Sequence, residues 1–311
     1  MNTEANGVPE PRLDPQASAP AAERETRPLY WSVRRELWEN RSIYIAPLAV
    51  AAVMLFGFCI SAIRVLEHRH AVLALDPAHQ RAAVQMPYDV AAFLLIVTAF
   101  LVGVFYCLDA LHGERRDRSI LFWKSLPVSD LTTVLSKAAI PLVILPLLSF
   151  AIIVATQLIM LLLSAAILPG SGAGAATLGG PLPLFRMWMA LFYALAAIAL
   201  WHAPIYGWLL LVSGWVRRAA FLWAVLPWFA IGVAEKFAFD TTHFASLVRY
   251  RLFGWYTQAF IPPAKGSVAM DPLSQLAPGR FLSTPGLWLG LAVAAALLAA
   301  VVRLRRTRGP S

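Results

Sequence analysis

The sequence predicts an all-α, polytopic membrane protein with six transmembrane helices. Of its 311 residues, 59% are hydrophobic and only 14% are charged, whereas about a quarter of the residues in a soluble domain are charged. The apolar residues form runs that are long enough to cross a hydrocarbon core of about 30 Å. The basic residues, which give a net charge of +9, stand mainly at the ends of these runs. That placement is typical of topology signals, so we do not expect a nucleic-acid-binding surface.

The chain divides into two tails and one membrane domain. Residues 1–28 are rich in Pro, Ala and Glu and contain no apolar run, so we expect a disordered cytosolic tail and no secretory signal. Residues 29–305 form the expected six-span domain, and residues 306–311 form a basic cytosolic tail.

An amphipathic helix is predicted over residues 29–42, directly before the first span. Aromatic and basic residues beside a span favour a helix that lies in the bilayer interface, and the alternative is a plain cytosolic extension of the span. The predicted apolar face holds Tyr30, Val33, Leu37 and Arg41, with Trp31 and Trp38 beside it, and the polar side holds Arg34, Arg35 and Glu39.

Two of the predicted spans are unusual. The third contains no charged residue from Ala138 to Gly170 and would measure about 50 Å as a straight helix. It therefore has to tilt, bend or project beyond the bilayer, and Pro141 and Pro146 offer bends. We expect Asp130 to cap the start of this helix. The fifth is short and contains Pro227, so we expect that it does not cross as one straight helix. The six spans are predicted at 43–63, 88–111, 138–168, 187–215, 219–234 and 285–302.

The orientation follows from the lysines and arginines. With the N-terminus inside the cell, the inner segments hold 17 of them and the outer segments hold 9, which places both termini in the cytosol. We therefore expect a multi-pass protein of the inner (cytoplasmic) membrane. The longest outer segment, 235–284, is rich in aromatic residues, which favours short helices that lie at the interface or dip into it.

Few residues could carry chemistry. Cys59 and Cys107 lie inside apolar runs, His68 and His70 do not share a helix face, and no metal-ligand set is evident. His202 lies near the middle of the fourth span. An ionisable group at that depth is a candidate for a transport pathway or an embedded enzyme, and the alternative is a neutral histidine that bonds a carbonyl freed by Pro204. No catalytic constellation stands out, so we do not expect an enzyme.

The glycine-rich stretch 169–183 is not a phosphate-binding loop, because no Lys-Ser or Lys-Thr follows its glycines. No such loop occurs elsewhere in the chain. Any ATP that the protein uses must therefore be hydrolysed by another polypeptide.

The most polar stretch between spans is 114–130. Its first half, Glu114–Arg118, is strongly charged, and its second half, Ile120–Leu126, is apolar apart from Lys124. A short helix of this kind could expose its charges to a partner and set its apolar side on the membrane. The alternative is an ordinary inner loop that only supplies positive charge.

This stretch resembles the segment after the second span of the type-2 ATP-binding-cassette permeases. The resemblance rests on the Glu114-Arg115 pair, a small apolar stretch, the Leu-Pro-Val-Ser of residues 126–129, and Lys137 beyond it. The interfacial helix, six spans, cytosolic termini and long outer segment also fit that family.

The resemblance implies the membrane-spanning permease subunit of an ATP-driven exporter, built as a homodimer or paired with a similar permease. A separate cytosolic ATPase would bind ATP-Mg, and the stretch 114–126 would be a coupling helix. One other hypothesis is a membrane scaffold or sensor that does not transport. A second, which fits the residues less well, is a membrane-embedded enzyme around His202. The sequence does not identify the substrate. The implied ATPase-coupling residues are Glu114, Arg115, Arg116, Asp117, Arg118, Trp123 and Lys124, and the interfacial-helix residues are Trp31, Arg34, Arg35 and Trp38.

Overall fold

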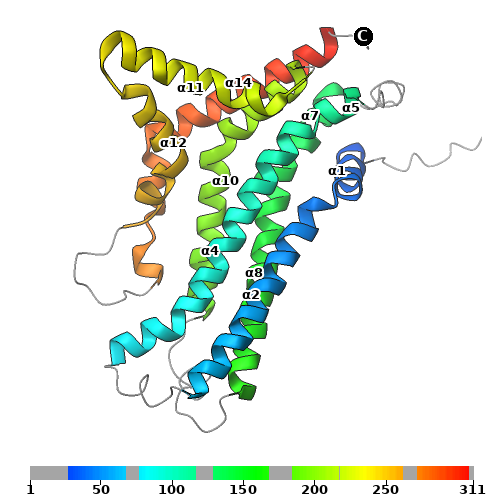
Figure 1. Cartoon of the computed structure of the whole chain (residues 1–311). Helices are drawn as coiled ribbons and strands as arrows, with labels where there is room; N and C mark the ends of the chain where they lie inside the picture. The colour runs from blue at the N-terminus through cyan, green and yellow to red at the C-terminus, as the bar shows by residue number, and fades with distance from the viewer. Residues whose placement is uncertain are drawn as a thin grey trace, which may run out of the picture.

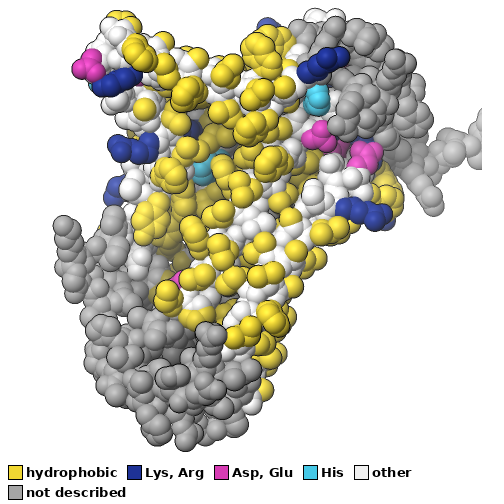
Figure 2. Space-filling model, in the orientation of Figure 1, with side chains coloured by type: hydrophobic (Ala, Val, Ile, Leu, Met, Phe, Trp, Pro, Cys, Tyr) yellow, Lys and Arg dark blue, Asp and Glu magenta, His cyan; other side chains and the backbone are white. Residues whose placement is uncertain are grey.

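A computed structural model describes residues 27–67, 77–116, 129–167, 184–216, 218–261 and 272–307. In these ranges every regular element is a helix, apart from one isolated bridge between Phe260 and Leu276. Six of the described helical segments are long and apolar enough to cross a membrane. The prediction of a helical fold with six helices that could span a membrane is therefore confirmed. Figure 2 shows hydrophobic side chains over most of the described surface in view, as contact with lipid requires.

The core is built around α10 (Leu184–Trp215). In the apolar window of α10, 61% of the residues are buried, against 11% in α11 (Ala220–Phe239). Helices α2 (Ser42–Glu67), α4 (Pro77–Asp109) and α8 (Leu145–Ile167) pack beside one another as long rods (Figure 1). Helix α14 (Pro285–Thr307) runs along α10.

The third span contains a widened turn. It consists of α7 (Asp130–Ala139), a π-helical turn at Ile140–Ile144 and α8. Pro141, one of the two prolines at which a bend is predicted, lies in this turn and interrupts the α-helical pattern, since a proline removes one helical hydrogen bond. The predicted cap is wrong, because the Ser129 hydroxyl accepts from the Thr132 N–H at 3.1 Å. Asp130 pairs with Arg305 instead.

The fifth span differs from the prediction. Helix α11 continues as one helix through Pro227 and ends at Phe239, five residues beyond the expected end at 234. The charges near its end are satisfied locally, because Lys236 pairs with Asp240. The Glu235 carboxylate accepts from the backbone N–H groups of His243 and Phe244, both at 2.8 Å. It therefore caps the start of the next helix, so the charged residues do not end α11.

Short helices follow in the segment 235–284, as predicted. They are α12 (His243–Ala259), a 3-10 turn at Pro272–Gln275, and α13 (Pro278–Ser283). Helix α12 packs against the middle of α10, where the Trp201 indole N–H donates to the Arg251 carbonyl at 3.0 Å. The segment thus returns along the bundle rather than forming a separate outer layer.

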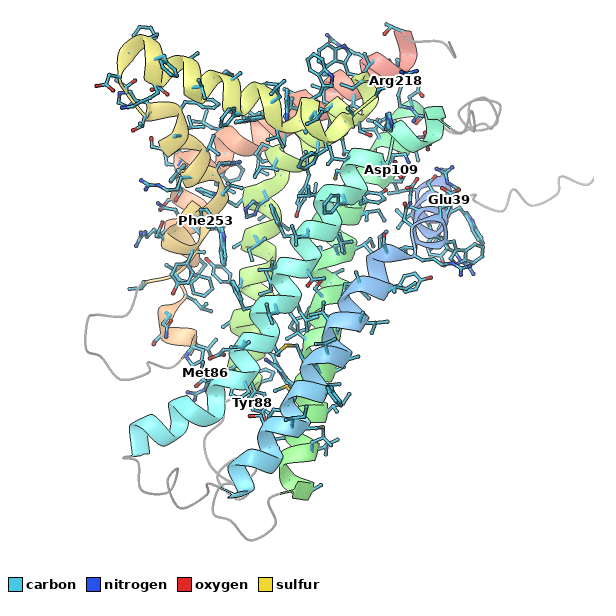
Figure 3. The ribbon with its side chains drawn as sticks, in the orientation of Figure 1. Glu39, Met86, Tyr88, Asp109, Arg218 and Phe253 are labelled. Carbon is cyan, nitrogen blue, oxygen red and sulfur yellow. The ribbon has the colours of Figure 1, made fainter. Side chains whose placement is uncertain are left out.

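The chain gathers several segments at one end of the bundle. Helix α1 (Pro28–Glu39), helix α5 (His112–Arg116), the start of α7 and the C-terminal end of α14 lie on the same side of the molecule (Figure 1). Figure 3 labels Glu39 and Asp109 at this end and Met86 and Tyr88 at the other. We call the first the charged end and the second the opposite end.

Candidate functional site

A buried group of charged side chains lies at the charged end, and we call it the charge cluster. In the described part of the chain it holds three acids and three bases, and Arg35 also lies 3.6 Å from the more exposed Glu39. Four helices supply them, and these helices are far apart in the sequence. The members are Arg35 and Glu36 of α1, Glu114 of α5, Asp130 and Lys137 of α7, and Arg305 of α14.

Lys137 is the centre of the charge cluster. Its ammonium lies 2.9 Å from Glu36 Oε1 and 3.0 Å from Glu114 Oε1. The side chains of Lys137 and Glu36 are only 2% and 1% exposed. A buried charge without a partner would cost several kcal/mol, so these pairs are a condition for folding α1 and α5 against α7.

The second oxygen of Glu36 is also satisfied. The Tyr106 hydroxyl of α4 donates to Glu36 Oε2 at 2.8 Å. Burial alone would raise the pKa of the Glu36 carboxyl, but Lys137, Arg35 and the Tyr106 hydrogen bond hold that pKa below its ordinary value of 4.5. Glu36 is therefore an ionised acceptor at neutral pH, which is the state that binds the ammonium.

Arg305 connects the last span to the same group. Its guanidinium lies 2.9 Å from Glu114 Oε2 and 3.3 Å from Asp130 Oδ1. Arg35 approaches Glu114 Oε1 at 3.4 Å from the other side. Both oxygens of Glu114 are thus held by cations of this chain, and α5 is linked at once to α1, α7 and α14.

Glu114 was expected to face a partner, and this expectation is wrong for its side chain. The residue is 9% exposed, and its carboxylate points into the charge cluster. It can act on a partner only through the helices that it joins. Arg115 and Arg116 belong to α5, but their side chains are not described, and the other expected coupling residues lie outside the described residues: Asp117, Arg118, Trp123 and Lys124.

Helix α1 presents two different faces. Val33 and Leu37 pack on the hydrophobic core beside the buried Glu36. Trp31 and Trp38 point outward, with exposed fractions of 57% and 67%.

The arginines of α1 separate in the same way. The Arg34 guanidinium lies 5.3 Å and 4.8 Å from the ring centroids of Trp31 and Trp38, a cation–π arrangement. Arg35 instead turns inward to Glu36 and Glu114. The prediction that Arg34 and Arg35 share a polar side is therefore wrong, and Tyr30, which is 56% exposed, does not join Val33 and Leu37 on the packed face.

His202 is buried between α10 and α12. Its Nδ1 lies 2.9 Å from the Ile198 carbonyl and its Nε2 lies 3.1 Å from the Leu252 carbonyl. Both ring nitrogens therefore face backbone oxygens, and a neutral imidazole, which has one N–H, can donate to one of them. The carbonyl involved is that of Ile198, four residues before the histidine, and not that of Leu200, which Pro204 leaves free.

The sequence pattern did not identify three of the site residues, which are Glu36, Tyr106 and Arg305. One signal could have found the first, because Glu36 lies between Val33 and Leu37 on a face that is otherwise apolar. A lone acid on a buried face requires a cation from another element. Which cation it meets could not be read, since Lys137 is 101 residues away.

Within the described ranges, no group of three or more His, Cys, Asp or Glu side chains could hold a metal ion. The geometry of the site is therefore that of an ion-paired joint between helices. Comparison of the chain with protein-family models, with curated proteins and with solved structures finds no match.

Proposed function

We propose that this chain is the transmembrane permease subunit of an ATP-driven exporter that works with a separate cytosolic ATPase. The observation that carries the proposal is the charge cluster, which joins α5 to α1, α7 and α14 through Glu114, Lys137 and Arg305. The stretch 114–130, which begins within α5, carries the resemblance to type-2 ATP-binding-cassette permeases. A push on that stretch would therefore reach the helix before the first span, the third span and the last span together.

The buried ion pairs would transmit a movement of α5 to the other helices. Glu114 holds Lys137 of α7 and Arg305 of α14 with opposite oxygens, so α5 cannot shift without moving both helices or breaking a buried pair. Breaking such a pair costs about 3–5 kcal/mol. Coupling also requires that the ATPase bind one arrangement of the spans more tightly than the other.

In this proposal the protein lies in the inner membrane, and its charged end faces the cytosol. Both termini are then cytosolic, in keeping with the bias of lysine and arginine. The outward face of α1, with Trp31, Arg34 and Trp38, suits the headgroup layer beside the first span. The chain would form a homodimer or pair with a similar permease, and ATP-Mg would bind to the ATPase.

The first experiment is co-purification. The tagged chain is purified from its native membranes in mild detergent, and the proteins that co-purify with it are identified and tested for ATP hydrolysis. We expect a stoichiometric complex whose ATP hydrolysis depends on this chain. A scaffold or sensor would purify without an ATPase, and that result would reject the exporter.

A further inference from the structure

A cavity of about 350 Å³ lies at the opposite end of the bundle from the charge cluster. It is open to the outside and is lined by residues of α4, α8, α10, the turn at Pro272–Gln275 and Phe260. Figure 3 labels Met86 and Tyr88 on the stretch of α4 that borders it. Its volume is in the range of about 300–1,000 Å³ that is usual for small-molecule sites.

The floor of the cavity is polar and fixed. Gln157 of α8 is buried, and its amide nitrogen donates to the Tyr88 carbonyl at 3.3 Å. Its amide oxygen accepts from the Trp188 indole N–H at 2.8 Å. The amide is thus held from two sides by neighbouring helices, and a polar group in a membrane-spanning helix that is held in this way is a preorganised contact for a ligand.

The wall carries one exposed acid among polar and apolar side chains. Asp89 of α4 is the only ionisable side chain among the described lining residues. The side chains of Met187 and Leu191 supply apolar surface beside it. An exposed acid beside apolar side chains favours a ligand that is both cationic and apolar.

An aromatic ring completes the lining. Phe260 follows α12 and is anchored by its backbone bridge to Leu276 and by stacking on Tyr256, with 5.6 Å between ring centroids. The face of an aromatic ring and a carboxylate both attract positive charge, so the two together suit an organic cation.

We propose that this cavity binds an amphipathic organic monocation, such as a substituted ammonium with an apolar group. Asp89 would pair with the cationic head, Phe260 would lie against it, and Met187 and Leu191 would receive the apolar part. A divalent metal ion does not fit, because Ca²⁺ takes six to eight oxygen ligands and the described lining supplies a single carboxylate. The binding of the cation does not depend on the proposed function. Its role as a transported substrate does rest on that function.

The test uses the purified full chain in nanodiscs without any ATPase, and its probe is radiolabelled benzyltrimethylammonium. We expect saturable binding that is about tenfold weaker in Asp89→Asn, because the variant removes the carboxylate that pairs with the cation. Asp109→Asn, an exposed aspartate at the other end of α4, is the matched control and should bind as the unaltered chain does. Ala190→Trp, which fills the cavity from α10, should abolish binding.

Two further probes separate charge from shape. Neopentylbenzene, the uncharged isostere of the probe, should compete at least tenfold more weakly, and benzenesulfonate should not compete. Equal binding of the cation to Asp89→Asn and to the unaltered chain would overturn the proposal, as would equal competition by the uncharged isostere. Because no ATPase is present, a failure of the exporter hypothesis would leave Asp89-dependent binding intact, and a failure of the site would leave ATPase coupling intact.

Discussion

Lys137 is the residue on which the charge cluster most depends. It is buried between the carboxylates of Glu36 and Glu114, and each of these has a further partner of its own. Such a group stabilises one arrangement of helices, since any other arrangement leaves a charge unpaired in a medium that cannot solvate it.

Replacing Lys137 by methionine should destabilise the folded chain by about 3–5 kcal/mol, because two buried carboxylates lose their shared cation. The measurement is reversible unfolding of the purified chain in mild detergent. Lys236→Met is the matched control, because Lys236 is exposed and pairs only with the exposed Asp240; it should change stability by less than about 1 kcal/mol. Equal effects of the two variants would contradict the account.

Because Glu36 is buried and ionised, we expect the stability of the folded chain to fall at acid pH. Its folded-state pKa is held below 4.5, mainly by Lys137, against the opposing effect of burial. A lowered pKa means that the stabilisation is complete above the ordinary value of 4.5 and is lost as the pH falls through the folded-state value. Thermal unfolding followed from pH 7 to pH 3 should therefore show a fall in the midpoint below pH 4.5. The Glu36→Gln variant should lose part of that fall, and an unchanged pH profile would reject the assignment.

At the residue scale the sequence showed which charged residues stand beside apolar runs, but it did not show which of these side chains pair with one another. Glu114 and Lys137 stand out because each interrupts or borders an apolar run. Their pairing with Arg305 and Glu36 bridges separations of 191 and 101 residues, and only the packing of four helices defines it. The direction of the Glu114 side chain, inward rather than toward a partner, follows from that packing alone.

At the scale of elements, helix α12 is held on α10 by close contact. A Cβ atom at Gly254 would lie 2.9 Å from the Tyr250 ring and 3.2 Å from the Trp201 ring. These two rings pack edge to face with 5.2 Å between centroids, so neither can move away freely. The absence of a side chain at Gly254 is what lets the two helices approach.

Gly254→Ala should therefore loosen α12 from α10 and cost about 1–3 kcal/mol, as overpacking does. Hydrogen exchange of the α12 amides is the direct readout and should become faster. Gly57→Ala is the matched control, because a Cβ there meets nothing within 4 Å, and alanine is the better helix former. Unchanged exchange in α12 of the Gly254 variant would show that the contact does not hold the helix.

The helices themselves could be predicted from hydropathy, because a span needs a long apolar run whatever its neighbours are. Their ends could be predicted less well. Helix α11 passes the expected end because Glu235 and Lys236 find partners in the following turn, and the cap of α7 is Ser129 rather than Asp130 because Asp130 is used by Arg305. The position of α12 against the middle of α10 has no counterpart in the sequence pattern.

At the scale of the whole molecule, the two ends of the bundle have different chemistry. The charged end joins α1, α5, α7 and α14 through buried ion pairs, whereas the opposite end holds a cavity with one carboxylate. Helix α10 spans the distance between them and packs along α14. Motion imposed at the charged end could thus change the opposite end through α14 and α10, which is what an ATP-driven permease requires.

The most direct test of this account is the ATP hydrolysis of the complex with Glu114→Gln. The variant keeps the size of the side chain and removes the charge that holds Lys137 and Arg305. We expect the ATPase to co-purify with the variant as with the unaltered chain, while the hydrolysis that depends on this chain falls about tenfold, equivalent to about 1.4 kcal/mol of coupling. Asp109→Asn is the control and should hydrolyse ATP at the unaltered rate. Full chain-dependent hydrolysis by Glu114→Gln would contradict the claim that the charge cluster couples the spans to the ATPase.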